Sequence, residues 1–160
     1  MNAQTIVDSV RGIVQPVYLP YGTKVSEHLV VGIDHVASPD TGEVFLLPEL
    51  IELFEAAREL WGQPVPVTAG YRTVEHEDAL RAAGYKTAKV ISPHCLGAAL
   101  DTDAGDEGQN IAWRETLKDA AGQLSLPVPR FGLVAYNGNF LHVDLAFLLF
   151  VPFTPIPNPL

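Results

Sequence analysis

Two short segments rich in metal-binding side chains constrain the fold of this chain most. Residues 92–101 contain His94 and Asp101, and His142 follows 41 residues after that aspartate. Two imidazoles and a carboxylate are donors that a catalytic zinc ion takes from a protein when its fourth position is kept for water. His94 and Asp101 are seven residues apart, an odd number, so one unbroken strand would point them to opposite faces. The chain must therefore turn between them to bring them together, and Gly97 is where such a turn can occur.

Three further residues can contribute to a site built on these donors. Asp144 lies two residues after His142, so on a strand both side chains share a face. Asp144 can orient a ligand histidine, take a proton from metal-bound water, or be an ordinary surface aspartate. Arg72 can hold a carboxylate or an oxyanion, or form a structural ion pair. Ser92 can contact a substrate or satisfy the backbone of a turn. The remaining histidines have no partner at a convincing spacing and are left out of the expected site: His28, His35 and His76.

Length and charge exclude several classes of protein. At 160 residues the chain is expected to form one domain with a substantial core. The net charge of −9 argues against nucleic acid as a partner, since phosphate binding needs a basic face. The single cysteine, Cys95, excludes an intrachain disulfide framework. We expect neither a signal peptide nor a membrane span, because the N-terminal pattern does not fit the first and no apolar run reaches the roughly 18 residues of the second.

Helices and strands are expected to alternate along the chain. The clearest helix covers 48–61, because Pro48 suits the first helical position, apolar residues recur on one face, and Gly62 fits just past the end. Thr73 is the expected N-cap of a second helix, which ends near Gly84. The other expected elements are strands at 29–33, 65–69 and 98–103, a turn at 38–42, a helix at 111–124, and strands at 133–136 and 140–149 joined by Asn137-Gly138.

Three segments together resemble the zinc D-alanyl-D-alanine carboxypeptidase and peptidoglycan endopeptidase family, whose fold is shared with the signalling domain of Hedgehog proteins. Residues 92–101 are similar to its Ser-x-His-x-x-Gly-x-Ala-x-Asp motif, and residues 67–73 to its Gly-Tyr-Arg segment. Residues 140–144 are similar to the second motif of a branch that ends in His-Val-Asp. The resemblance covers about residues 45–145.

This resemblance implies a fold, a cofactor and a set of site residues. The implied fold is α+β, with an antiparallel β-sheet that carries a zinc site and helices packed on the opposite face. Arg72 is implied as a catalytic and substrate-binding residue that contacts the substrate carbonyl or carboxylate, with Ser92 as a secondary contact. The implied ligands of Zn²⁺ are His94, Asp101 and His142.

One position departs from the family pattern. Carboxypeptidases of this family usually have a catalytic glutamate three residues before the last histidine, and this chain has Asn139 there. Asparagine can orient a water but cannot accept its proton at neutral pH. Asp144 is therefore the leading candidate for the catalytic base, and the alternatives are another carboxylate or a zinc-binding chain without rapid hydrolysis.

Together these observations predict a single domain over 1–160, with an N-terminal arm at 1–23, a peptidase-like core at about 45–145 and a proline-rich tail at 150–160. We expect a zinc metallopeptidase, either a carboxypeptidase or an endolysin-like endopeptidase, that cleaves peptidoglycan stem or cross-link peptides containing D-amino acids. The alternative is a zinc-stabilised, non-catalytic binding or virion-structural module of the same fold. Without a signal peptide, such an enzyme would be made in the cytoplasm and reach the wall by lysis or on a phage particle.

Overall fold

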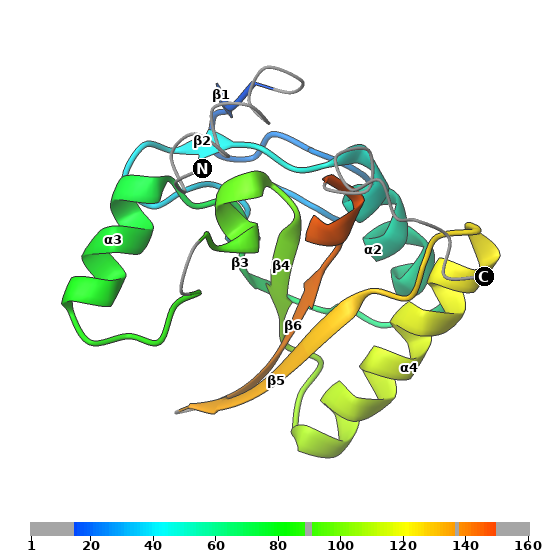
Figure 1. The fold of residues 1–160 in the computed structure, drawn as a ribbon. Helices are drawn as coiled ribbons and strands as arrows, with labels where there is room; N and C mark the ends of the chain where they lie inside the picture. Colours follow the sequence, from blue (N-terminus) through cyan, green and yellow to red (C-terminus); the bar gives the residue numbers. More distant parts are fainter. Residues whose placement is uncertain (1–14, 89–90, 137, 150–160) are drawn as a thin grey trace, which may run out of the picture.

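The computed structural model describes residues 15–88, 91–136 and 138–149, whose arrangement is shown in Figure 1. Within them the chain forms three α-helices and two antiparallel sheets. The α+β class predicted from the sequence is therefore confirmed. The expected tail at 150–160 and residues 1–14 of the expected arm lie outside the described residues, and the division of the chain into arm, core and tail stays a prediction.

A four-stranded antiparallel sheet organises the molecule, with strand order β3-β4-β6-β5. These strands are β3 (Val67–Ala69), β4 (Ala99–Thr102), β5 (Arg130–Tyr136) and β6 (Gly138–Asp144). The register pairs Asp101 on β4 directly with His142 on β6. Directly paired residues stand on the same face of a sheet, so two of the predicted ligands are brought together by strand pairing alone. A smaller sheet joins β1 (Val17–Tyr18) to β2 (Glu43–Val44).

The face of the sheet opposite Asp101 is covered by helices. Thr102 alternates with Asp101 along β4, and Trp113 of α4 (Glu107–Gln123) donates its indole N–H to the Thr102 hydroxyl at 2.9 Å. Trp113 is fully buried and contacts Phe54 of α2 (Pro48–Trp61) edge to face, with ring centroids 6.2 Å apart. Figure 1 shows α2 and α4 together on this side of the sheet. The apolar core therefore lies on one face, and the other face is left for polar side chains, as predicted.

Helix α2 has the bounds that the sequence predicts. Its buried face consists of Leu50, Leu53, Phe54 and Ala57. Gly62 ends the helix in the left-handed conformation, with a φ of 74°, and its N–H donates to the Arg58 carbonyl at 3.0 Å. That conformation strains any residue with a Cβ, which explains why glycine follows the last turn.

The other helices begin where side chains cap them. The Thr73 hydroxyl accepts the His76 N–H at 3.1 Å, so α3 (Val74–Ala82) begins as predicted. Helix α4 begins at Glu107, four residues before the expected start at 111, because Asp106 and Gln109 form a capping box. The Asp106 carboxylate accepts the Gln109 N–H at 2.8 Å, and the Gln109 side chain accepts the Asp106 N–H at 2.9 Å. No described helix is long and apolar enough to cross a membrane.

Two expected strands differ most from the structure. The strand expected at 140–149 ends at Asp144, because its carboxylate accepts the Ala146 N–H at 3.2 Å and turns the chain into the short 3₁₀ helix η2 (Ala146–Leu149). The strand expected at 29–33 makes only isolated bridges within the described residues. There the Asp34 carboxylate accepts the Val30 N–H at 3.0 Å. This backbone N–H is therefore not available for pairing with a neighbouring strand.

Candidate metal centre

A tight turn brings His94 to Asp101. The short 3₁₀ helix η1 (Pro93–Leu96) has Ser92 as its N-cap, and the Ser92 hydroxyl accepts the His94 N–H at 3.3 Å. Gly97 ends η1 with a φ of 66°, and a Cβ placed on it would lie 2.6 Å from the carbonyl oxygen of Phe45. Both the backbone angle and the lack of space therefore require glycine here. The turn predicted between the two ligands is confirmed.

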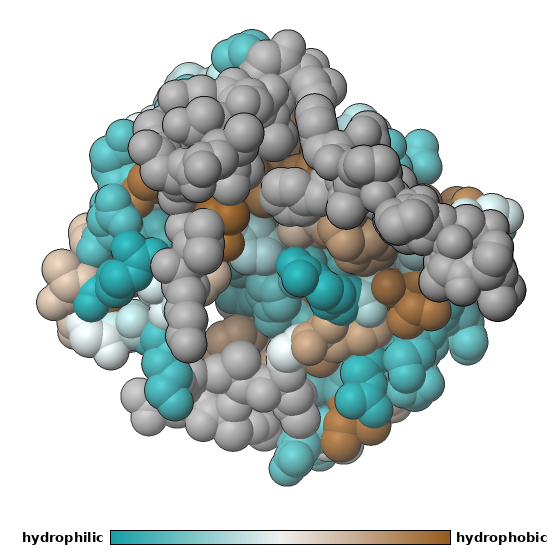
Figure 2. Space-filling view, in the orientation of Figure 1, coloured by the Kyte–Doolittle hydropathy of each residue, from teal (hydrophilic) through white to brown (hydrophobic). Residues whose placement is uncertain are grey.

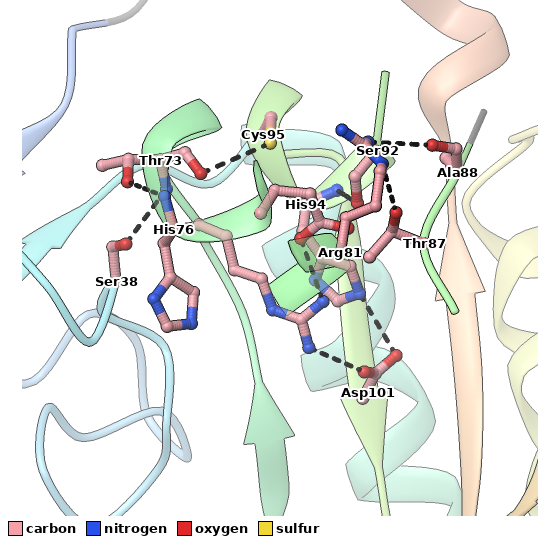
Figure 3. A network of polar contacts seen from close by, with 12 residues as sticks. Ser38, Thr73, His76, Arg81, Thr87, Ala88, Ser92, His94, Cys95 and Asp101 are labelled. Carbon is pink, nitrogen blue, oxygen red and sulfur yellow. Dashed lines mark hydrogen bonds and ion pairs between the residues drawn. The ribbon is translucent and has the colours of Figure 1, made fainter. Parts of the chain in front are cut away.

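The three predicted ligands converge on one point. The Nε2 atom of His94 lies 3.3 Å from Asp101 Oδ1, and the Nδ1 atom of His142 lies 3.0 Å from the same oxygen. One donor atom from each residue lies within 4.8 Å of the others, so the group could hold a metal ion. His94 and Asp101 are buried, while the His142 side chain is 21% exposed. Figure 3 shows His94 and Asp101 approaching each other from η1 and β4, and Figure 2 shows this face hollowed between the regions of α3 and β5, with hydrophilic residues at the border.

The hydrogen bonds of both imidazoles hold one proton of each ring away from this point. His94 Nδ1 lies 2.7 Å from the Gly70 carbonyl oxygen, which can only accept, so Nδ1 carries the proton and Nε2 presents a lone pair. His142 Nε2 lies 2.9 Å from Asp144 Oδ2, an arrangement that leaves His142 Nδ1 as the atom facing Asp101. Once His142 Nδ1 has lost its proton, two nitrogen lone pairs and a carboxylate oxygen face one another, as a metal ion would need; with that proton in place, His142 donates to Asp101 instead. Such a largely buried set is stabilised by a positive charge among its members, either a proton or a metal ion.

The pKa values of the cluster point to the same preference for positive charge. Burial acts to raise the pKa of Asp101, but its close contacts with His142 and His94 hold it well below the usual range for an aspartate. Burial acts to lower the pKa of His142, but hydrogen bonds to Asp101 and Asp144 raise it to about 9. The cluster thus attracts a proton when no metal is bound. Its donor chemistry and charge fit a divalent cation, which can replace that proton.

Asp144 is held by several partners. Its Oδ1 atom accepts hydrogen bonds from Arg130 Nε at 2.9 Å and from the Ala146 N–H at 3.2 Å, while Oδ2 faces His142. Arg130 pairs directly with Asp144 across β5 and β6, which explains why the guanidinium reaches it. Burial acts to raise the pKa of Asp144, but hydrogen bonds from His142 and Arg130 lower it below its ordinary value. Asp144 is therefore an ionised group that accepts from both of its neighbours.

Arg72 borders the cluster from the β3–α3 connection. Its Nη2 atom lies 3.6 Å from Asp101 Oδ2, and its Nη1 atom lies 3.3 Å from Glu77 Oε2. Glu77 is buried at 3% exposure, whereas the Arg72 side chain is 21% exposed. The buried carboxylate therefore fixes the guanidinium beside the metal centre while leaving part of it accessible to a ligand.

The structure adds residues that sequence reasoning missed. Glu77 and Arg130 carry no motif of their own, and their roles follow from contacts with Arg72 and Asp144. The spacing of five between Arg72 and Glu77 gives a weak signal, since the first turns of a helix can bring such residues together. Ser92 is buried and accepts a backbone N–H, and its expected contact with substrate stays a prediction.

Comparison with known proteins places the chain among the peptidases. The family model described as Peptidase M15 matches residues 22–144. The chain belongs to the Peptidase M15 family. This confirms the resemblance to the carboxypeptidase and endopeptidase family noted above, whose members are metallopeptidases. None of the curated proteins matches this M15 peptidase in sequence.

Among solved structures, the M15 peptidase is similar to the L-Ala D-Glu endopeptidase ChiX of Serratia marcescens. The two share 19% sequence identity with a TM-score of 0.48, and the match covers 64% of this chain and 82% of that chain. At this level the likeness does not bear on activity or substrate. Family membership and the geometry of the three ligands are the findings on which a function rests.

Proposed function

We propose that this M15 peptidase is a zinc enzyme that cleaves peptidoglycan stem or cross-link peptides containing D-amino acids. The observation that supports zinc is the convergence of His94 Nε2, His142 Nδ1 and an oxygen of Asp101 at one partly open point. Tetrahedral ligands about 2.1 Å from a zinc ion lie about 3.4 Å from one another. The observed separations of Asp101 from His94 and His142, 3.3 and 3.0 Å, are close to that value, and all three donor atoms lie within 4.8 Å of one another.

The substrate class follows from the motifs that the chain shares with its family. A zinc ion at this site would polarise the scissile carbonyl and supply a reactive water near neutral pH. Arg72 would hold the carbonyl oxygen or a terminal carboxylate of the peptide, a role supported by its partly exposed guanidinium beside Asp101. The buried Glu77 keeps that guanidinium in position before the substrate arrives.

For Asp144 the sequence leaves two functional roles open, and we propose that it orients His142. Its Oδ2 atom faces His142 Nε2, and its Oδ1 atom is occupied by Arg130 and the Ala146 N–H. A carboxylate in this position fixes the tautomer and the ring orientation of a ligand histidine. The role of Asp144 as proton acceptor stays a prediction, and the kinetic test given in the Discussion separates the two.

A second function is a zinc-stabilised module that binds cell-wall or virion components without catalysis. Asn139 favours it, because asparagine stands where carboxypeptidases of the family have a catalytic glutamate. The pairing of Asp144 with Arg130 favours it as well, because a carboxylate neutralised by a guanidinium is a weaker base. Delivery by lysis or on a phage particle stays a prediction under either function.

One experiment separates these possibilities. The full chain is purified, its metal content is measured by mass spectrometry, and it is incubated with synthetic stem peptides and with intact peptidoglycan. We expect about one zinc per chain and cleavage that chelation abolishes and added zinc restores, and the product masses identify the bond. Bound zinc without cleavage of any peptide would support the non-catalytic module. A chain that binds no metal under these conditions would contradict both functions.

A further inference from the structure

A cavity of about 380 Å³ adjoins the metal centre on the side of α3. Its walls are the loop at 31–39, the β3–α3 connection and the first turns of α3. It shares Gly70 and Arg72 with the metal centre: the Gly70 carbonyl holds His94, and Arg72 faces Asp101. A peptide whose scissile carbonyl lies beside Asp101 would therefore place a neighbouring residue in this cavity. The volume is at the small end of the range for ligand sites, roughly 300–1,000 Å³, and suits one or two amino-acid residues.

The acidic groups at this cavity are already engaged by the protein. Asp34 is 7% exposed, and its two oxygens accept the N–H groups of Val30 and Val67 at 3.0 and 3.2 Å. Asp40 lies nearby, and its oxygens accept the hydroxyls of Ser38 and Thr73 at 2.5 Å each. Neither carboxylate needs a partner from a substrate. The cavity therefore presents no unsatisfied acidic group among its described residues.

Two imidazoles from different segments of the wall are the groups that remain available. His35 comes from the loop at 31–39, and His76 comes from the first turn of α3, beside Ser38 in Figure 3. Within the described part of the chain, neither ring forms a hydrogen bond. Burial acts to raise the pKa of Asp40, but the hydroxyl hydrogen bonds of Ser38 and Thr73 and, as a smaller contribution, the nearby His76 lower it below its ordinary value. Together with the Arg72 guanidinium at the metal end, the cavity offers donors and positive charge to its occupant.

We propose that this cavity is a substrate subsite for a residue carrying a free carboxylate, which His35 and His76 bind. The inference rests on the proposed function, because it concerns the peptide that the metal centre would cleave. Val31 and Leu80 in the walls provide apolar contact for the carbon chain of the same residue. Stem peptides offer the required group in two places, as a glutamyl carboxylate and as the C-terminal carboxylate.

The test compares peptides that differ only in this group. Two pairs are synthesised: one exchanges the glutamyl carboxylate for a primary amide, and the other exchanges the C-terminal carboxylate for an amide. The zinc-loaded full chain is assayed with all four. For one pair we expect KM to rise about tenfold to a hundredfold on amidation with little change in kcat, as for the loss of a charge-assisted hydrogen bond. The pair that responds identifies which carboxylate occupies the cavity.

Variants then assign the effect to the two histidines. In His35→Gln and His76→Gln, the ratio of KM for the amide peptide to KM for the acid peptide should fall toward one, while kcat and zinc content stay unchanged. The fall should be largest in the double variant. His28→Gln is the matched control, because His28 contacts Glu55 outside this cavity, and it should keep the preference. Circular dichroism verifies that each variant folds. Shifts of the His35 and His76 ring signals on adding the acid peptide, recorded by NMR on the unmodified chain, provide a readout that needs neither variants nor turnover.

The possible results distinguish failure of the proposed subsite from failure of the proposed peptidase function. Cleavage of the acid and amide peptides with equal KM in both pairs would refute the proposed subsite but not the proposed peptidase activity. A preference for the acid peptide that persists in the double variant would have the same consequence. If no peptide is cleaved, the proposed catalysis fails, and calorimetry with the same four peptides decides the subsite. Equal affinity for acid and amide, or ring signals that do not shift, would then refute it.

Discussion

Two clusters in this molecule pair histidine with a carboxylate, and they differ in how completely their donors and acceptors match. The first is the metal centre formed by His94, Asp101 and His142. The second, here called the Glu55 cluster, consists of Ser26, His28 and Glu55 and fastens the loop before residue 31 to helix α2. Both lie partly buried, and both contain residue types that bind metals.

In the Glu55 cluster the carboxylate is satisfied by the protein alone. The Ser26 hydroxyl and the His28 backbone N–H donate to Oε1, and His28 Nδ1 lies 2.6 Å from Oε2. Burial acts to raise the pKa of Glu55, but these hydrogen bonds lower it below its ordinary value. Donors point at one ionised acceptor, and no further cation is needed.

In the metal centre the acceptors exceed the donors. One proton of each imidazole is directed outward, to Gly70 and Asp144, so His94 Nε2 and, after loss of its proton, His142 Nδ1 face the Asp101 carboxylate as lone pairs. The same residue types therefore form a structural hydrogen-bond cluster around Glu55 and a candidate ligand set at the metal centre. The orientation of the hydrogen bonds, more than the composition of a cluster, indicates which of the two can bind a metal.

The largest expected effect comes from removing one imidazole from each cluster. His94→Ala should reduce the zinc content from about one per chain to near zero and abolish hydrolysis, because two remaining ligands hold the ion poorly. His28→Ala should keep the zinc, because its ring faces Glu55. Metal analysis after dialysis against a weak chelator measures both. Loss of zinc in both variants would contradict the distinction between the clusters.

The next effect concerns Arg72, which places a positive charge beside the metal centre. Arg72→Lys should lower kcat by about 10²–10³ while zinc stays bound, because the lysine cannot span Glu77 and the substrate oxygen together. Steady-state kinetics with zinc content measured on the same sample provide the test. Arg114→Lys, at a partly exposed position of α4, is the control and should leave kcat unchanged. Unchanged kcat in Arg72→Lys would exclude a role for this guanidinium in the reaction.

A smaller effect separates the two roles of Asp144. If it orients His142, Asp144→Asn should weaken zinc affinity about 10–100-fold, and kcat should recover nearly completely once zinc saturates the site. If it is the proton acceptor, kcat should fall about 10²–10⁴-fold even at saturating zinc. Zinc titration against a competing chelator, followed by kinetics at saturation, distinguishes the outcomes. Asp119→Asn on the exposed side of α4 is the matched control.

The smallest effect is on the Glu55 cluster and appears in stability. Glu55→Gln should lower the free energy of unfolding by about 1–3 kcal/mol at neutral pH, because hydrogen bonds to an ionised acceptor are lost. The pKa of Glu55 is lowered in the folded chain, so its contribution is full above the unfolded value, about 4.3, and disappears as pH falls through the lower folded value. The difference between the two proteins should therefore shrink below about pH 4.

Urea unfolding of both proteins between neutral and acidic pH measures this difference, and any loss of metal in acid affects both equally. Glu59→Gln on the exposed face of the same helix is the control, for which we expect no change at any pH. A difference between Glu55→Gln and the original chain that stays constant down to pH 3 would show that the charge of Glu55 does not stabilise the fold.

Local features of the fold follow directly from the sequence. The bounds of α2, the N-cap at Thr73 and the positive φ of Gly97 depend on interactions between residues a few positions apart, and such interactions leave short-range patterns. Expectations based on apolar runs were less successful. The strand expected to reach residue 149 stops at Asp144, because a side-chain hydrogen bond to the Ala146 backbone competes with strand pairing.

By itself, the sequence determined the turn between His94 and Asp101, because spacing and a glycine are local information, and the resemblance of its motifs to a known family added His142 to the candidate ligands. Tertiary structure alone decided their orienting partners, the cavity with His35 and His76, and the difference between the metal centre and the Glu55 cluster. Asp101 meets His142 across 41 residues, and His28 meets Glu55 across 27. Contacts over such distances depend on how strands pair and helices pack, and a single sequence gives no period or spacing from which to infer them.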